Sequence, residues 1–197
     1  MRFCDEGNFG FGWLDQDDRL RRASHALAAE GGVWLVDPVV WPEAEARVRQ
    51  LGEPRGVVQL LDRHERDCAD VAERLGVPHH VVPRAPIEGA PFELLPVSGW
   101  RLWREVALWW PGRRVLVVAD ALGTVGYFRA PGERLGVHPL LRLRPPRALR
   151  LVFPEHVLTG HGAGVHADAA RTLHRALATS RRRLPAALWS AFRARGS

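Results

Sequence analysis

The sequence predicts a layered protein of mixed strands and helices, with the helices on the outside of a sheet. Residues 33–38 form a nearly continuous apolar run, which is typical of a strand buried on both faces. Apolar strands then alternate with compact helical segments at 42–51 and 68–75, the order that packs helices against a sheet. The chain has 197 residues, 46% of them hydrophobic, so it can bury a full core and is most simply one domain over 1–197.

Local signals set the expected order of the elements. Pro42 opens the first helix and Gly52 ends it, while Gly76 ends the second. The turn 111–114 joins two apolar runs into a hairpin. Segment 126–150 is loop-like, and we interpret it as an insertion near a site mouth, either a lid or a packed surface loop. The expected strands are 9–14, 26–29, 33–38, 57–61, 77–83, 92–95, the second half of 100–110, 115–120 and 149–153, and the expected helices are 42–51, 68–75, 168–177 and 185–195.

The basic charge is a weak argument for a nucleic-acid partner. The formal net charge is +6 and the isoelectric point is about 10.9, but every Lys or Arg position is Arg. Together with a single Ile and a single Asn, this bias is typical of a GC-rich genome. The arginines are scattered along the chain except for 181–183, which we interpret as a solvated helix end. The absence of Lys excludes Schiff-base and P-loop chemistry.

Compartment signals favour a reduced, cytoplasmic protein. No stretch of the sequence is long and apolar enough to span a membrane, and the first residues lack a signal-peptide core. Cys4 and Cys68 fit neither a disulfide framework nor a zinc cluster. We therefore expect no membrane partner. The oligomeric state is not predicted.

Charged residues follow the strand 57–61 directly, in the run Leu60 to Cys68. Side chains alternate along a strand, so Asp62 and His64 are expected on one side, with Arg66 and Asp67 at the entry to the helix 68–75. This predicts a cluster of two carboxylates, an imidazole and a guanidinium. The alternative is that Asp67 caps the helix with help from Asp70, while Arg66 and Asp62 form a surface salt bridge.

Two further positions have the chemistry of a site. Asp120 ends the buried strand of LVVADAL, where a desolvated carboxylate is costly unless it meets a cation, either a metal or Arg66. His161 stands between two glycines in HVLTGHGAGV, and a turn by itself needs no imidazole. Asp37, in LVDP, is interpreted as a turn residue that supports the site from behind. His79 and His80 are expected on opposite faces of a strand, so they do not share one metal.

The run Leu60 to Cys68, the strand end LVVADAL and the turn HVLTGHGAGV resemble motifs of the metallo-β-lactamase superfamily. The run from Asp62 to Asp67 is similar to a degraded T-H-x-H-x-D-H signature, in which Asp62 replaces the first His, His64 matches the second, Arg66 replaces the Asp and Asp67 the last His. LVVADAL resembles L-x-x-G-D-x-L, whose Asp bridges metals, and HVLTGHGAGV resembles x-V-x-x-G-H-G, whose His is a ligand. The resemblance implies an α+β fold, a four-layer αββα sandwich of metallo-β-lactamase type, in the compact branch similar to hydroxyacylglutathione hydrolases.

The sequence departs from the family where a second metal would be held. Residues 84–119 contain no His, and the guanidinium of Arg66 cannot serve as a ligand. We predict that Arg66 fills the room of one ion, which leaves at most one divalent zinc, manganese or iron ion. The candidate ligands are the following residues: Asp62, His64, Asp67, Asp120 and His161.

The implied function is hydrolysis of a small-molecule ester, thioester, lactone or phosphoester by metal-activated water. Asp67 or Asp120 would orient the water, and Arg66 would stabilise oxyanion charge. The alternative is a catalytically silent member of the fold that binds no metal, with Arg66 in its place, and that binds a small anion or a partner. The tryptophans of 100–110 are expected in the core rather than in a pocket wall.

Overall fold

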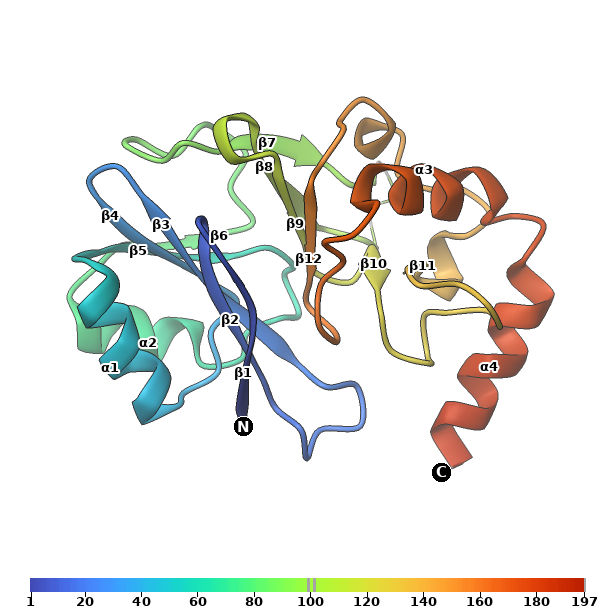
Figure 1. Cartoon of the computed structure of the whole chain (residues 1–197), viewed down its shortest axis with the longest axis horizontal. Helices are drawn as coiled ribbons and strands as arrows, with labels where there is room; N and C mark the ends of the chain where they lie inside the picture. The colour runs from blue at the N-terminus through green and yellow to red at the C-terminus, as the bar shows by residue number, and fades with distance from the viewer. Residues whose placement is uncertain (99, 101, 197) are drawn as a thin grey trace.

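A six-stranded sheet forms one half of the protein in the computed structural model, which describes residues 1–98, 100 and 102–196. Its strand order is β1-β2-β3-β4-β5-β6 (Figure 1). The pairs β1–β2, β2–β3 and β3–β4 are antiparallel, whereas the pairs β4–β5 and β5–β6 are parallel. The strands are β1 (Arg2–Gly7), β2 (Gly10–Leu14), β3 (Ala23–Ala29), β4 (Gly32–Val36), β5 (Pro54–Gln59) and β6 (His79–Val81).

Two helices cover the outer face of this sheet, within the boundaries that the sequence predicts. Helix α1 (Pro42–Leu51) begins with proline in its first turn, where the missing N–H has no helical partner to lose. Helix α2 (Cys68–Leu75) ends at Gly76, whose φ of 66° is left-handed. Asp67 precedes α2 but its side chain makes no capping hydrogen bond, so the alternative in which Asp67 caps this helix is wrong.

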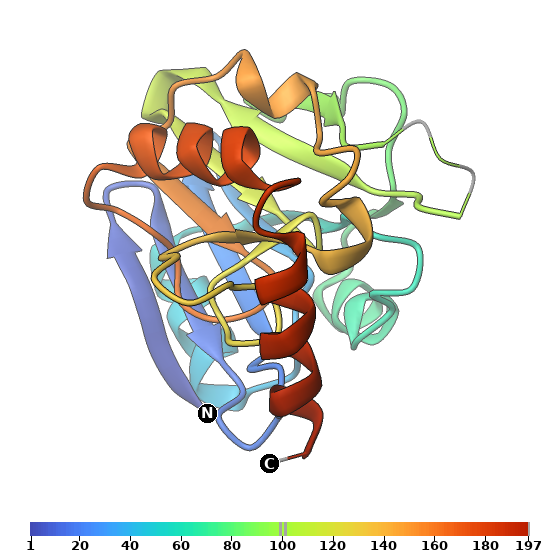
Figure 2. The ribbon, with the colours of Figure 1, turned by 90° about the vertical axis from the view of Figure 1, so that its right-hand side faces the viewer.

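A four-stranded sheet in the order β12-β9-β8-β7 forms the other half. The strands are β7 (Glu93–Pro96), β8 (Val106–Trp110), β9 (Val115–Val118) and β12 (His156–Thr159). The predicted hairpin is confirmed, because β8 and β9 pair antiparallel across the 3₁₀ turn Pro111–Arg113. Helix α3 (Ala169–Thr179) lies over this sheet, and α4 (Leu184–Gly196) runs crosswise to α3 (Figure 2).

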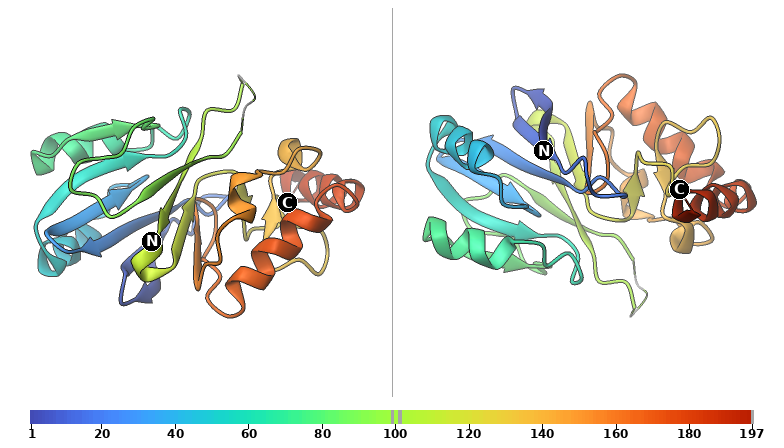
Figure 3. Two further views of the ribbon diagram at one scale, coloured as in Figure 1. Left: turned by 90° about the horizontal axis from the view of Figure 1, so that it is seen from above. Right: turned by 90° about the horizontal axis from the view of Figure 1, so that it is seen from below.

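Three separate apolar clusters show that the layers are helix, sheet, sheet and helix. One cluster packs α1 and α2 against the first sheet, another fills the space between the sheets, and the third lies between the second sheet and α3. Alternation along single strands produces this division: Val33 and Leu35 face α1, whereas Trp34 and Val36 face the other sheet. The predicted four-layer αββα sandwich is therefore confirmed, with the helices at the two ends of the view in Figure 3.

Several elements differ from the expectation. Strand β1 was not predicted, and the predicted strand 149–153 is instead a 3₁₀ turn over Ala148–Arg150 followed by irregular chain. Leu149 is buried there but Leu151 is 79% exposed, so the two side chains do not share a sheet face. Segment 126–150 is a packed loop, because its Phe128 is buried. It includes β11 (Gly136–Val137), which pairs with β10 (Leu122–Gly123), and the 3₁₀ turn Pro139–Leu141.

The tryptophans divide between core and surface. Trp103 and Trp110 are buried and Trp109 packs against the core, as expected, but Trp100 is 48% exposed. Arg101 falls inside the tryptophan-rich run 100–110 and Gly99 directly precedes it, and both lie outside the described residues. Among the helices that the structure describes, none combines the length and the apolar character needed to cross a bilayer.

Candidate metal centre

Three side chains from three separate loops converge where the two sheets meet. Asp120 Oδ1 lies 3.0 Å from His64 Nε2 and 3.0 Å from His161 Nε2. One ligand atom from each of the three residues can be chosen so that all lie within 4.8 Å of one another. These are the His64, Asp120 and His161 positions that the sequence predicts, brought together from across nearly 100 residues of chain.

Strand ends and glycines place the three residues. Asp120 follows β9, His161 follows β12, and these two strands are parallel, so both residues leave the same edge of the sheet. A side chain at Gly160 would press on the backbone of Ala119, with Cβ 2.9 Å from its carbonyl oxygen. Gly162 has a φ of 87°, which glycine adopts without strain. The glycines beside His161 therefore let its loop lie against the loop of Asp120.

Each imidazole is held from behind through its Nδ1 atom. His64 Nδ1 donates to Asp37 Oδ2 at 3.1 Å, and His161 Nδ1 donates to the carbonyl oxygen of Leu20 at 2.9 Å. With Nδ1 as the donor, the neutral tautomer of each ring has its lone pair on Nε2. Both lone pairs then point at the carboxylate of Asp120. This confirms the supporting position that we expected for Asp37.

The three atoms have the arrangement of ligands around a cation. Although both nitrogens lie 3.0 Å from Asp120 Oδ1, that buried oxygen has no hydrogen-bond partner among the described residues. An unpartnered buried carboxylate oxygen is costly, and two lone pairs aimed at it increase the cost. A divalent ion between the three atoms would remove this cost, because imidazole nitrogen and carboxylate oxygen are ordinary ligands of zinc. The residues present therefore fit a metal ion.

The contacts within the cluster shift the pKa values of His64 and Asp120. Burial and the charge of Arg66 lower the pKa of His64, but the carboxylates of Asp120 and Asp37 outweigh them and raise it to about 9. Burial raises the pKa of Asp120, but the rings of His161 and His64 outweigh it and hold this pKa well below its usual range. A proton on His64 thus places a positive charge between the carboxylates of Asp120 and Asp37.

Comparison with solved structures identifies the fold. Across 92% of this chain and 97% of the other, the structure is similar to that of DIM-1 metallo-β-lactamase, with a TM-score of 0.62 and 12% identity. The chain has the metallo-β-lactamase fold. It is also similar to the BLEG-1 B3 metallo-β-lactamase (TM-score 0.55, 15% identity, 78% of this chain and 93% of that one) and to a metallo-β-lactamase from Pontibacter korlensis (TM-score 0.55, 12% identity, 90% and 98%). No protein-family model and no curated protein matches the sequence.

Within this metallo-β-lactamase fold, the degraded signature contributes His64 to the cluster but neither of its carboxylates. The predicted shared side of Asp62 and His64 is wrong, because β5 ends at Gln59 and the chain turns before either residue. Asp62 Oδ2 lies 3.9 Å from Arg104 Nε at the surface instead. Asp67 Oδ2 accepts a hydrogen bond from the backbone N–H of Val40 at 2.7 Å. In the described chain, neither carboxylate belongs to the three-residue group.

Arg66 lies beside the cluster but makes no salt bridge with Asp62. Its guanidinium donates from Nη1 to the carbonyl oxygens of Ala23 and Asp37, and from Nη2 to that of Gly160 at 2.9 Å. Ala23 is the first residue of β3, whereas Asp37 and Gly160 directly follow β4 and β12. Arg66 therefore joins the two sheets at the edge that carries the site. The neighbours of Asp120 Oδ1 are the Nε2 atoms of the two imidazoles, each at 3.0 Å, and not the guanidinium of Arg66.

Sequence reasoning missed Glu105, which positions Asp120. Its buried Oε1 accepts from the backbone N–H groups of Ala119 and Ala121, each at 3.0 Å, and Oε2 accepts from Trp103 Nε1 at 2.7 Å. The residues on both sides of Asp120 are thus held by one carboxylate. Burial and the charge of Asp120 raise the pKa of Glu105 to about 8. A carboxylate in the otherwise apolar 103–110 run is the signal that could have found it.

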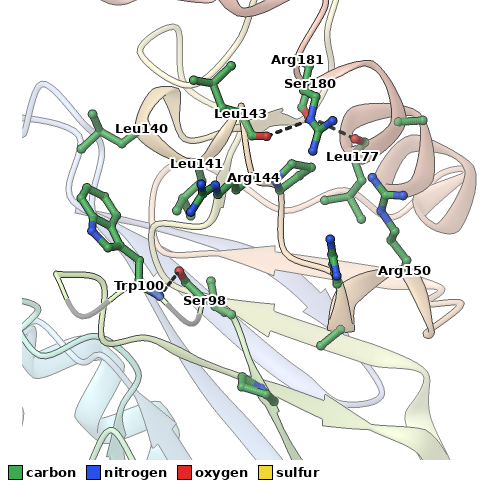
Figure 4. Close-up of a pocket in the computed structure, with 16 residues that line it drawn as sticks. Ser98, Trp100, Leu140, Leu141, Leu143, Arg144, Arg150, Leu177, Ser180 and Arg181 are labelled. Atoms are coloured by element: carbon green, nitrogen blue, oxygen red, sulfur yellow. Dashed lines mark hydrogen bonds between the residues drawn. The ribbon is translucent and has the colours of Figure 1, made fainter.

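A separate groove of about 1600 Å³ lies at the edge of the second sheet, with no cluster residue in its lining. Figure 4 shows Arg144 and Arg150 projecting around it, with Trp100 at one side. Three of the arginines that line the groove come from the segment 144–150, and the fourth comes from the residues that follow α3. The four that line it are Arg144, Arg147, Arg150 and Arg181, and no carboxylate occurs among the described lining residues.

Proposed function

We propose that this chain is a hydrolase that binds one divalent metal ion through His64 Nε2, Asp120 Oδ1 and His161 Nε2. The observation that carries the proposal is the buried Asp120 oxygen without a hydrogen-bond partner, which faces two imidazole nitrogens at 3.0 Å. Two nitrogens and one carboxylate oxygen suit zinc, manganese or iron. Three protein ligands leave a coordination position open for water or substrate.

The charges around the cluster support one ion rather than two. Asp37 and Asp120 bring carboxylates to this edge of the sheets, whereas the pKa of Glu105, raised to about 8, leaves that carboxyl group mostly protonated near neutral pH. The guanidinium of Arg66 and one divalent ion already exceed the charge of these two carboxylates, and a second ion would add two more positive charges. The sequence predicts the same number of ions, with Arg66 in the room of a second ion, although it assigned the negative charges to Asp62, Asp67 and Asp120.

The bound ion would supply Lewis-acid polarisation of the substrate and a bound water of lowered pKa. This chain's own residues supply the positioning. Asp37 and the carbonyl of Leu20 accept from the Nδ1 atoms of the two histidines, so each neutral ring presents the lone pair of Nε2 to the ion. Glu105 holds the backbone on both sides of Asp120, and Phe128 stacks on His161 with ring centroids 5.6 Å apart. Rigid support of this kind keeps ligands in place through a reaction cycle.

The substrate class is a small ester, thioester or phosphoester. The similar solved proteins are named metallo-β-lactamases, so cleavage of a β-lactam amide belongs in the same panel of substrates. All these reactions place negative charge on an oxygen in the transition state, which is what a Lewis-acidic ion stabilises.

The decisive experiment is metal content by elemental mass spectrometry after equilibrium dialysis against zinc, manganese or ferrous iron. We expect a His64→Gln/His161→Gln variant to hold one equivalent less than the parent protein. The matched control is His79→Gln/His80→Gln, which removes two partly buried histidines on β6 and should hold as much as the parent. Equal metal in the parent and the first variant would overturn the proposal.

The role of Arg66 has its own test in the same assay. If Arg66 fills the room of a second ion, Arg66→Asp should bind one equivalent more than the parent. No gain in a variant that still unfolds cooperatively would end that part of the proposal. The catalytically silent alternative, with a small anion at Arg66, has less support because Nη1 and Nη2 already donate to backbone carbonyls.

A further inference from the structure

A second group of histidine and carboxylate side chains lies at the other end of β12 from His161. It consists of Asp5 from β1, His156 at the start of β12, and His166 from the loop before α3. His166 Nε2 lies 3.0 Å from Asp5 Oδ1, and His166 Nδ1 lies 3.0 Å from His156 Nδ1. The group therefore forms a chain from a carboxylate through one imidazole to another.

The carboxylate of Asp5, at one end of this group, is buried and its orientation is fixed by its surroundings. The side chain of Asp5 is 2% exposed, and its φ of 53° is left-handed at an irregularity in the pairing of β1 with β2. Such bulges redirect a side chain, and a non-glycine residue with positive φ stores strain that functional sites often contain. Gly164 N donates to Asp5 Oδ1 at 2.8 Å, and Cys4 Sγ lies 3.4 Å from Oδ2. Both carboxylate oxygens are thus engaged within the protein.

The position of Asp5 determines which nitrogen of His166 is available. An ionised carboxylate only accepts, so His166 Nε2 donates its proton to Asp5, and the neutral ring has its lone pair on Nδ1. Asp5 Oδ1 also accepts a hydrogen bond from the backbone N–H of Gly164, as the oxygen of a carboxylate does. The lone pair on His166 Nδ1 consequently accepts a hydrogen bond from His156 Nδ1, and a metal ion between the two nitrogens would take the place of that proton.

Two nitrogens at this separation match two ligands of one ion. With metal–nitrogen bonds of about 2.1 Å, neighbouring ligand atoms lie about 3.0 to 3.4 Å apart. His166 is 37% exposed, so water can reach the remaining coordination positions.

We propose that His156 Nδ1 and His166 Nδ1 bind a divalent ion of the imidazole-preferring class, such as copper, nickel or zinc, with Asp5 as the residue that orients His166. A carboxylate behind a ligating histidine is the usual support of such sites. The ion would tie β12 to the loop before α3, and through Asp5 to β1. This inference does not depend on the proposed function, because it shares no residue with the His64, Asp120 and His161 cluster.

The test uses the full chain carrying His64→Gln/His161→Gln, so that binding at the first cluster is removed. Equilibrium dialysis against Cu²⁺ should leave one equivalent bound, and the electron paramagnetic resonance spectrum should contain hyperfine coupling to imidazole nitrogen. Adding His156→Gln or His166→Gln should abolish both signals. Adding His79→Gln/His80→Gln should change neither.

Asp5→Asn provides a separate readout for the orienting role. It should weaken Cu²⁺ binding about 10- to 100-fold without removing the nitrogen coupling, because the two ligands remain. Zn²⁺ should raise the melting temperature of the background variant but not that of the variant that also lacks His166. Binding that survives His156→Gln and His166→Gln, or no binding in the background variant, would overturn the inference.

Discussion

Asp37 Oδ2 accepts a hydrogen bond from His64 Nδ1 at 3.1 Å, on the side of the imidazole that faces away from Asp120. Its other oxygen, Oδ1, accepts from the backbone N–H of Leu60 at 3.0 Å. Asp37 is buried and follows β4, whereas Leu60 follows β5. One carboxylate therefore ties together two neighbouring strand ends and selects the tautomer of a candidate ligand.

Asp37→Asn should weaken metal binding at the first cluster about 10- to 100-fold. Asparagine tolerates the left-handed φ of 44° at this position and can still accept from Leu60, but its amide group cannot accept the His64 proton if the oxygen faces Leu60. Competition with a chromophoric zinc chelator measures the affinity. Asp168→Asn is the control, because Asp168 also has a positive φ but is exposed. Unchanged affinity in Asp37→Asn would contradict the orienting role.

The metal-free protein should lose stability as the pH rises from about 6.5 to about 9. The pKa of His64 is about 9 in the folded state, against about 6.5 for an ordinary histidine side chain. A raised folded-state pKa contributes stability that is fully present below the unfolded value and is lost as pH rises through the folded value. The contribution is on the order of 3 kcal/mol. Urea unfolding of the chelator-treated protein across this range measures it.

His64→Gln should flatten that dependence. Glu105, with its pKa raised to about 8, acts in the same direction between about pH 4.5 and 8, so the difference between parent and variant isolates the His64 contribution. At the acid end, Asp120 has a lowered pKa, and its contribution is lost as pH falls through that value. An equally steep alkaline loss in both proteins would contradict the assignment to His64.

Glu105→Ala should destabilise the protein and loosen Asp120. The change leaves the N–H groups of Ala119 and Ala121 buried without their acceptor, at a cost of about 1–3 kcal/mol for each group. We expect a lower free energy of unfolding together with weaker metal binding. Glu93→Ala, an exposed glutamate on β7, should change neither quantity.

Glu133→Gln should destabilise the protein by about 3–5 kcal/mol. Arg142 is fully buried and lies 2.6 Å from Glu133 through Nη2, so the substitution leaves a buried charge without its counterion. Glu155→Gln breaks a 2.8 Å pair with Arg114 that is exposed, and should cost less than about 1 kcal/mol. Chemical denaturation of both variants compares the two pairs directly. Equal losses would show that burial does not set the cost.

Local chemistry explains the elements that the sequence predicts well. Helices α1 and α2 have their own start and stop residues, and the β8–β9 hairpin joins strands that are adjacent in the chain. The prediction of a strand at 149–153 was wrong because its apolar residues do not share one face. Which of them are buried depends on the surrounding structure. The nearly continuous apolar run of β4 predicted burial on both faces, and its alternate residues do face two different apolar clusters.

The residues of the site also divide into those that a local motif predicts and those whose role depends on distant contacts. His64, Asp120 and His161 were found because each stands in a motif of its own segment. Asp62 was misplaced because β5 ends at Gln59, three residues before it, so strand alternation no longer applies. Asp67 lies at the start of α2 as predicted, but its carboxylate accepts from Val40 N and does not join the cluster. Glu105 and the Leu20 carbonyl were missed because their roles depend on contacts with distant segments.

The sequence by itself determined the layered α+β architecture, the helix boundaries and three residues of the first cluster, because periodicity, capping and glycine-flanked turns act over a few residues. The tertiary structure alone decided which charges meet. Arg66 bonds to carbonyls from three separate strand ends, and Asp5 meets His166 across 161 positions of sequence separation. Hydrogen bonds of a few ångströms between distant segments depend on how the sheets pack, and no local pattern in the sequence specifies that packing.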